Sequence, residues 1–260
     1  MSVTEDAPAA TSARRATITE PASLRRVSPW WVLVGACALL LVLAGAALLA
    51  WWAATRETRI TTYHVVGDLS SLALDVGAAD VEIDGGGSGA VEVRRTDRFA
   101  FGHPATERHT VSGGSVTIAS RCPKQLLGAC HSAYRVTVPD NVGVTVTTTS
   151  GRVLIAGLRA SARIATTSGA IAASGFCGFS LRATSGSGLV QAAAECSPDR
   201  MELRSGSGDV QATLPPGRYQ VDASSDSGHA RVSGLTVADD APFAVQALSG
   251  SGDVTVEGMP

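Results

Sequence analysis

The sequence predicts an all-β protein, a parallel β-solenoid (β-helix) preceded by a single transmembrane helix and a disordered N-terminal tail. Three observations predict this class. A Ser-Gly corner recurs six times at spacings of 18, 19, 20, 20 and 24 residues, apolar residues alternate on both sides of each corner, and a long uncharged run lies near the N-terminus. A nearly constant period of this size is typical of a solenoid with one coil per repeat. The corner glycines are Gly151, Gly169, Gly188, Gly208, Gly228 and Gly252.

The first two segments are a tail and a membrane span. Residues 1–29 are rich in Ala, Thr, Ser and Pro without periodicity, which predicts disorder. Residues 30–52 carry no charge and form a helix of about 34 Å, enough to cross a hydrocarbon core of about 30 Å. Paired tryptophans at both ends suit the two interfaces. The alternative is a cleaved signal peptide, whose apolar core is usually shorter, about 7–15 residues.

Charge around this span predicts its orientation. Four arginines precede it and two follow closely, so the positive-inside rule favours a cytoplasmic N-terminus and an extracytoplasmic segment 53–260 in the cell membrane. The four preceding arginines are Arg14, Arg15, Arg25 and Arg26.

Residues 53–59 are expected to be a linker, and 60–142 an irregular β cap with the first coils. Leu72 and Leu74, with Val81 and Ile83, fit the repeat pattern if Ala79 stands at a corner, which predicts a degenerate coil. Such a cap would cover the first apolar end of the stack. Two polar stretches are expected to be loops, namely 94–108 and 122–130.

Residues 143–258 are expected to form the regular solenoid. The positions seven and five residues before each corner glycine, and two and four after it, are apolar in all six repeats. This period of two predicts two short strands per coil with one buried face, because a helix would show a period of about 3.6. The sequence leaves open whether the last coil is short or whether residues 234–247 fold over an end.

Five cysteines divide between the two parts of the chain. Cys37 lies in the predicted span, where a small apolar residue suffices. The other four lie in the expected oxidising compartment. Cys177 and Cys196 each stand eight residues after a corner glycine, so adjacent coils would place them about 4.8 Å apart, within disulfide reach. We predict this bridge and, by elimination, Cys122–Cys130; free thiols are the alternative.

The motifs argue against catalysis, cofactors and bound metal. Neither a Gly-x-Ser-x-Gly elbow nor a phosphate-binding P-loop occurs. His103 and His109 could meet His131 at a metal, but their spacing favours solvated loop histidines. Asp209 and Asp253 follow corner glycines, yet the dense glycine pattern of calcium-binding β-rolls is absent.

Ser and Thr hydroxyls form two columns at the corners, directly before the glycine and three residues before it. They could form a strip that binds sugar or a surface polymer. We favour a structural role, in which glycine allows the corner and the hydroxyls bond turn backbone groups.

Two stretches carry a family resemblance. Tyr-Arg-Val-Thr-Val-Pro-Asp at 134–140 leads into Thr-Thr-Thr-Ser-Gly-Arg-Val-Leu-Ile-Ala-Gly-Leu at 147–158. They resemble the bacterial putative-adhesin family, a repeat-rich domain of unknown function in cell-envelope proteins, and the likeness spans about 60–258. The resemblance implies a repeated β architecture and supplies no catalytic residues.

Together these patterns predict a non-enzymatic, membrane-anchored, extracytoplasmic solenoid that binds a surface ligand or envelope protein, as an adhesin does, or has a structural role. A sensor or accessory protein of an envelope-stress signalling system is the alternative. A net charge of −2 and 5% aromatic residues argue against nucleic acid as a partner. The open ends of a stack also favour self-association.

Overall fold

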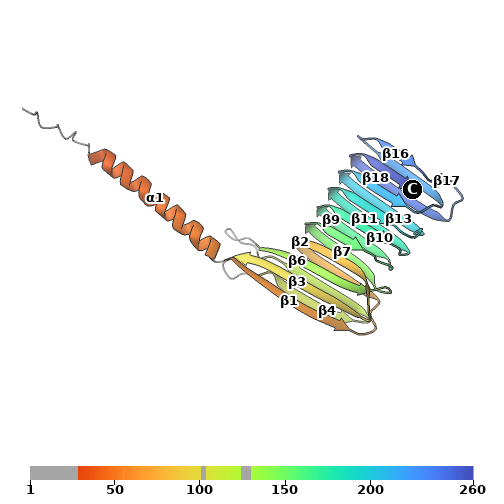
Figure 1. The fold of residues 1–260 in the computed structure, drawn as a ribbon, viewed down its shortest axis with the longest axis horizontal. Helices are drawn as coiled ribbons and strands as arrows, with labels where there is room; N and C mark the ends of the chain where they lie inside the picture. The colour runs from red at the N-terminus through yellow and green to blue at the C-terminus, as the bar shows by residue number, and fades with distance from the viewer. Residues whose placement is uncertain (1–28, 55, 101–103, 124–129, 260) are drawn as a thin grey trace, which may run out of the picture. The chain divides into compact units, whose positions relative to one another are not determined.

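The computed structural model describes residues 29–54, 56–100, 104–123 and 130–259 (Figure 1). The chain divides into two compact units, Met1–Ala50 and Trp51–Pro260. The first contains most of helix α1 (Pro29–Ala54), whose stretch Trp30–Ala54 includes an 18-residue window with a mean hydropathy of 2.8 that is not buried, as a membrane span requires. The predicted tail lies outside the described residues, apart from Pro29, which begins α1.

The second unit is a stack of coils in which two sheets face each other across the core (Figure 1). We call them sheet A and sheet B. In spatial order, sheet A contains β1 (Arg56–Val66), β3 (Ala90–Ala100), β6 (Cys130–Pro139), the second half of β2 (Ser71–Gly87), β8 (Val153–Ala156), β10 (Ile171–Phe176), β12 (Val190–Ala194), β14 (Val210–Leu214), β19 (Val254–Gly258) and β16 (Ala230–Ser233).

Sheet B is built from the other strand of each coil. In spatial order it contains β4 (Thr106–Ser112), β5 (Ser115–Arg121), the first half of β2, β7 (Gly143–Ser150), β9 (Ala162–Ser168), β11 (Ser180–Ser187), β13 (Arg200–Ser207), β18 (Phe243–Ser251), β15 (Arg218–Ser225) and β17 (Thr236–Val237).

The predicted solenoid class is confirmed, and its core is the apolar pattern read from the repeats. Strands from successive coils pair in parallel with matching columns, as Leu181 opposite Met201 and Ile171 opposite Val190 show. In five of the six repeats, the four core positions are at most 4% exposed. The exception is the repeat at 218–233, where Val232 is 40% exposed. That coil must therefore lie at an end of the stack.

The spatial order departs from the chain order at the far end of the stack. The last coil, β18 and β19, pairs with β13 and β14 on one side and with β15 and β16 on the other. In the chain, residues 234–242 connect β16 to β18. They run along the outer edge of β15, where Val237 lies opposite Tyr219. The extra residues of the longest repeat thus lead the chain around the end of the stack and back into it. Of the two possibilities that the sequence left open, a short last coil or a segment that folds over an end, the structure has the second, with residues 234–242 at the end.

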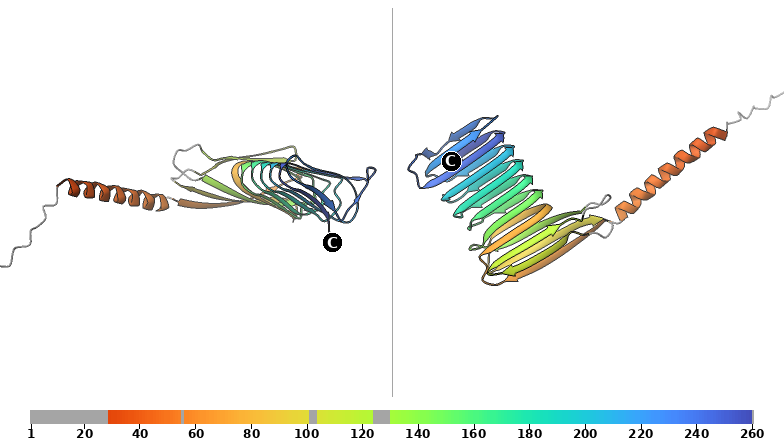
Figure 2. Two further views of the ribbon diagram at one scale, coloured as in Figure 1. Left: turned by 90° about the horizontal axis from the view of Figure 1, so that it is seen from above. Right: turned by 180° about the vertical axis from the view of Figure 1, so that it is seen from behind.

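At the opposite end of the stack, the spatial order also departs from the chain order (Figure 2). β2 forms the degenerate coil, with Leu72 opposite Val144 and Ile83 opposite Ile155. The later strands β5 and β6 lie outside β2, and the antiparallel strands β4, β3 and β1 close that end.

Two segments differ from the sequence prediction. The stretch 94–108 is not a loop, since β3 runs to Ala100 and β4 begins at Thr106, with 101–103 outside the described residues. Its inward positions include Arg95 and Asp97, whose polarity hides the alternation of a strand. The predicted linker 53–59 is taken up by the end of α1 and the start of β1. Of the predicted loop 122–130, residues 124–129 lie outside the described residues.

Candidate binding surface

The corner glycines have a structural role, because the backbones of adjacent coils approach closely there. A Cβ atom on Gly169 would lie 2.1 Å from the carbonyl oxygen of Gly151, and one on Gly188 would lie 2.4 Å from that of Gly169. Real side chains do not tolerate such distances. Gly188 also adopts a φ of 144°, which residues other than glycine resist.

The hydroxyl column three residues before each glycine completes the corner. Ser205 Oγ donates to the carbonyl oxygen of Gly188 at 2.8 Å, and Ser249 Oγ donates to that of Gly208 at 2.8 Å. These side chains are buried, as is Thr166, whose Oγ1 has no hydrogen-bond partner. Five of the six hydroxyls in this column therefore bond backbone carbonyl oxygens of an adjacent coil, and among the described residues Thr166 is the exception.

Aspartates that follow a corner glycine accept backbone N–H groups of the neighbouring coil. Asp209 Oδ1 accepts from Asp253 N–H at 2.9 Å, and Asp253 Oδ1 accepts from His229 N–H at 2.9 Å. The hydrogen bond from His229 lowers the pKa of the Asp253 carboxyl. Asp80, which follows Ala79 at the corner of the degenerate coil, likewise accepts the backbone N–H of Arg152 at 2.8 Å. Each carboxylate thus acts as a backbone acceptor.

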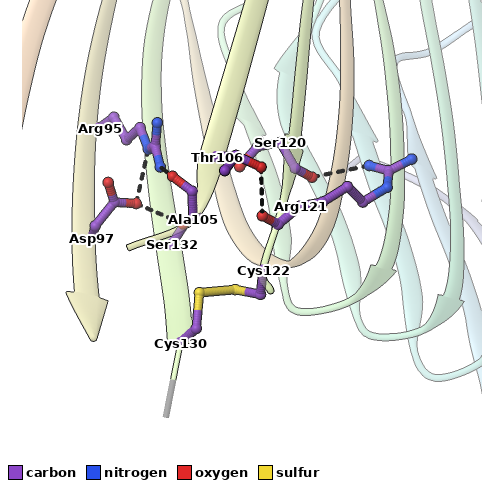
Figure 3. The surroundings of a disulfide bond; sticks show 9 residues. All are labelled: Arg95, Asp97, Ala105, Thr106, Ser120, Arg121, Cys122, Cys130 and Ser132. Carbon is purple, nitrogen blue, oxygen red and sulfur yellow. Dashed lines mark hydrogen bonds and ion pairs between the residues drawn. A yellow bond between two sulfur atoms is a disulfide. The ribbon is translucent and has the colours of Figure 1, made fainter. Parts of the chain in front are cut away.

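Two disulfides tie the coils together. Cys177 and Cys196, on consecutive coils, are bonded with their Cα atoms 4.7 Å apart. Cys122, after β5, is bonded to Cys130 at the start of β6, with a Cα separation of 5.8 Å (Figure 3). The Cys177–Cys196 bridge is the one predicted from the repeat register, and Cys122–Cys130 is the one predicted by elimination. Cys37 in α1 is a free thiol.

A buried polar cluster lies near the Cys122–Cys130 bridge and was missed in the sequence (Figure 3). Arg95 Nε contacts Asp97 Oδ1 at 2.8 Å, its Nη1 contacts Glu107 Oε2 at 3.0 Å, and its Nη2 donates to the carbonyl oxygen of Ala105 at 2.6 Å. Ser132 Oγ donates to Asp97 at 2.7 Å. The only signal in the sequence is that Arg95 and Asp97 continue the inward positions of β3.

Two tyrosines complete this cluster. Tyr63 and Tyr134 donate their hydroxyls to the two oxygens of Glu107, at 2.8 and 3.1 Å. Burial raises the pKa of both phenols, so both stay protonated and remain donors at neutral pH. All the strands that meet here belong to the cap, so the cluster closes this end of the solenoid.

The two described histidines of the possible metal site lie on different strands, β4 and β6. His131 Nε2 lies 3.1 Å from Asp80 Oδ2, His109 lies on β4, and His103 is outside the described residues. Within the part of the chain that the structure describes, no three His, Cys, Asp or Glu side chains are placed to hold a metal ion.

The outer face of sheet B carries a groove of 350 Å³, lined by residues of β2, β7, β9, β11 and β13, which we call the basic groove. Long arginine side chains stand over a floor of short residues. The groove-lining side chains that project outward are Ser71, Thr145, Ser161, Arg163, Ser180, Arg182, Arg200 and Glu202, with Gly143 in the floor.

Ion pairs inside the basic groove are unevenly distributed. Arg182 Nη2 contacts Glu202 Oε2 at 2.6 Å, and Arg200 Nη1 lies 3.8 Å from Glu202 Oε1. Arg163 is exposed and has no ion pair among the described residues. The sequence holds a signal for this feature, because Arg163 and Arg182 occupy the same outward position in consecutive repeats.

Two other grooves differ in charge. Further along sheet B, a 380 Å³ groove is lined by Glu202, Asp222 and Asp239 beside Arg200. On sheet A, a groove of 810 Å³ holds Glu82, whose Oε2 accepts from Arg135 Nε at 2.9 Å. The sheet A groove also contains three arginines, Arg94, Arg135 and Arg152, but beside two carboxylates, Asp80 and Glu82. The three arginines of the basic groove have Glu202 alone, so this groove has the higher net positive charge.

Comparisons with known proteins agree with this architecture. Residues 135–257 match the family model described as Toastrack DUF4097. The crystal structure of a putative cell adhesion protein from Clostridium sporogenes is similar, with a TM-score of 0.51, 10% identity, and coverage of 78% of this chain and 100% of that one. The resemblance to the putative-adhesin family is confirmed.

Other similarities are more distant. A putative adhesin from Bacteroides fragilis has a TM-score of 0.41 at 13% identity and covers 77% of this chain and 97% of its own. A putative adhesin from Parabacteroides merdae has a TM-score of 0.32 at 9% identity, with 78% and 97% covered. None of the curated proteins compared with the chain matches it.

Proposed function

We propose that this chain is a membrane-anchored, extracytoplasmic β-solenoid that binds a component of the cell envelope or surface without catalysing a reaction. One observation carries the proposal: the uncharged helix α1 is followed within two residues by a solenoid that contains two disulfides. The helix is long enough to span a bilayer, and structural disulfides persist in oxidising compartments.

The solenoid suits binding more than catalysis. Its two outer faces are built from stacked strands held by inter-coil hydrogen bonds, and such stacks present rigid, extended surfaces to partners. Its buried polar groups are engaged in the corners and in the cap cluster, with Thr166 as the exception among the described residues. The Clostridium sporogenes structure described as a putative cell adhesion protein supports this interpretation.

A reporter test addresses the anchoring and orientation. Alkaline phosphatase fused after Pro260 of the full chain should be active in a bacterial host, because it folds only outside the cytoplasm. A fluorescent protein that matures only in the cytoplasm, fused at the same position, is the matched control and should stay dark. Fluorescence without phosphatase activity would contradict the proposed orientation. Release of the chain from membranes by alkaline carbonate would contradict the anchor.

A second test addresses binding. Cells that display the full chain should be retained on immobilised cell-envelope material more strongly than cells carrying a vector without it. The matched control displays the chain with Val146 replaced by Asp, which disrupts the core while the anchor is kept. Equal retention of all three strains would overturn the binding function.

A further inference from the structure

The basic groove places two like charges side by side. Arg163 on β9 and Arg182 on β11 are direct partners in the parallel register, so their Cα atoms are separated by one strand spacing, about 4.8 Å. Like charges at opposed positions of neighbouring strands are destabilising. Glu202 offsets this on one side only, since it contacts Arg182 and Arg200 but not Arg163.

The surroundings of the two arginines suit an oxyanion. A guanidinium group presents a planar fork of donors that matches a phosphate or carboxylate group in bidentate geometry. In the same groove as these guanidinium groups, Ser180 Oγ donates to Ser161 Oγ at 3.1 Å. The floor therefore offers hydroxyl groups to further oxygen atoms of a bound anion. A bound anion would relieve the repulsion between Arg163 and Arg182.

The shape of the groove favours a polymer over a single anion. The groove crosses β7, β9, β11 and β13, and its arginines come from three consecutive coils. Arg163 and Arg182 lie opposite each other, whereas the position opposite Arg182 on β13 is Glu202, and Arg200 lies two residues earlier on that strand. The chain as a whole has a net charge of −2, so the attraction is a property of this groove and not of the overall charge.

The geometry points to a binding site for a linear polyanion, whose phosphate or carboxylate groups lie along Arg163, Arg182 and Arg200 over the serine floor. This inference deepens the proposed function and rests on it, because it names the ligand class of the extracytoplasmic surface. Glu202 limits the affinity, since it competes for two of the three guanidinium groups.

The test uses the full chain in nanodiscs of zwitterionic lipid, with Arg14, Arg15, Arg25 and Arg26 replaced by Gln so that the tail cannot bind the probe. Fluorescently labelled linear polyphosphate, labelled polygalacturonate and neutral dextran are titrated and followed by anisotropy. Polyphosphate or polygalacturonate should bind and dextran should not. The logarithm of the affinity should fall with the logarithm of salt concentration, with a slope of about −2 for three contacts.

Three variants locate the site. Arg163→Gln with Arg182→Gln should weaken binding at least about tenfold and reduce the salt slope by more than half. The matched control, Arg218→Gln with Arg231→Gln, removes the same charge from the acidic end of sheet B and from sheet A, and should leave binding unchanged. Glu202→Gln should strengthen binding several-fold. Circular dichroism checks that each variant keeps the strand content of the parent.

The outcomes are decisive in both directions. Binding of one polymer identifies whether phosphate or carboxylate is preferred, and binding of both supports a general oxyanion site. Equal affinity of the Arg163/Arg182 variant and its control would overturn the site. Binding only to vesicles of anionic lipid would overturn the polymer in favour of a membrane surface. Envelope retention that is unaffected by the Arg163/Arg182 variant would leave the proposed function standing while this inference fails.

Discussion

At the residue scale, the corner shows how one glycine column specifies a whole stack. Each glycine leaves space that the carbonyl of the adjacent coil fills, and the hydroxyl three residues earlier bonds such a carbonyl. The repeat therefore encodes distance between coils as well as turn conformation. Ser-Gly recurs because the backbones come close there.

Replacing Gly188 with Ala should lower the free energy of unfolding by about 2–4 kcal/mol, because the new Cβ would lie 2.4 Å from the Gly169 carbonyl oxygen at an unfavourable φ. Chemical denaturation of the full chain in detergent measures this. Gly86→Ala is the control, since Gly86 has a φ of 94° but no atom within 4 Å of its Cβ position. It should cost about 1 kcal/mol. Equal losses would show that collision between coils is unimportant.

Arg95 belongs to the same scale, and its removal should be costly. Arg95→Met leaves the buried Asp97 and the half-buried Glu107 without the cation that both contact, which typically costs about 3–5 kcal/mol. Arg135→Met breaks the exposed pair with Glu82 and should cost much less, because solvent screens that pair. Unfolding curves compare the two variants. A smaller loss for Arg95→Met than for Arg135→Met would contradict the role assigned to the cap cluster.

Asp80 predicts a pH dependence. Burial alone would raise the pKa of this carboxyl, but the Arg152 N–H and the His131 side chain outweigh burial and lower it. A lowered folded-state pKa stabilises the fold above the ordinary value of 3.8, and this contribution is lost as pH falls through the folded-state pKa. Asp80→Asn should therefore be less stable than the parent near neutral pH, and the difference should vanish in acid. Thermal midpoints across this range provide the measurement; a constant difference would refute the linkage.

At the element scale, the regular coils follow from the sequence and the cap does not. The four apolar columns predict the strands from β7 to β14 and the pairing among them, because the inward positions on both sides of each corner are apolar and the other buried positions are the Ser and Thr of the corners. In β3 the inward positions include Arg95 and Asp97, so the pattern that identifies a strand is broken by a buried ion pair. For the basic groove the sequence holds one signal, the arginines at the same outward position of consecutive repeats, but the apolar columns alone do not reveal it.

The disulfides also belong to this scale, because each joins two neighbouring strands or coils. Cys177→Ser with Cys196→Ser should reduce the free energy of unfolding by about 3 kcal/mol, as expected for a loop of this length. Alkylation of the denatured parent should label only Cys37 without reductant and all five cysteines after reduction. Labelling of five cysteines without reductant would contradict both bridges.

At the scale of the whole molecule, the chain places its last coil inside the stack. The repeat pattern alone could not reveal this, because all six repeats share the same core columns and any order of coils satisfies them. What distinguishes the orders is burial: the repeat at 218–233 has exposed core positions, whereas the last repeat is covered on both sides. A C-terminal coil held between two others is also protected from fraying.

Val232 and Val256 test this order directly, because they occupy the same column and lie opposite each other on β16 and β19. Val256 is 0% exposed and Val232 is 40% exposed. Val256→Asp would bury a carboxyl group and should unfold the stack or cost at least about 4 kcal/mol, whereas Val232→Asp can reach water and should cost about 1 kcal/mol. Stacking in chain order would reverse this ranking, because the last coil would then form the open end. Denaturation of the two variants, with Val232→Thr and Val256→Thr as uncharged controls, therefore decides between the two orders.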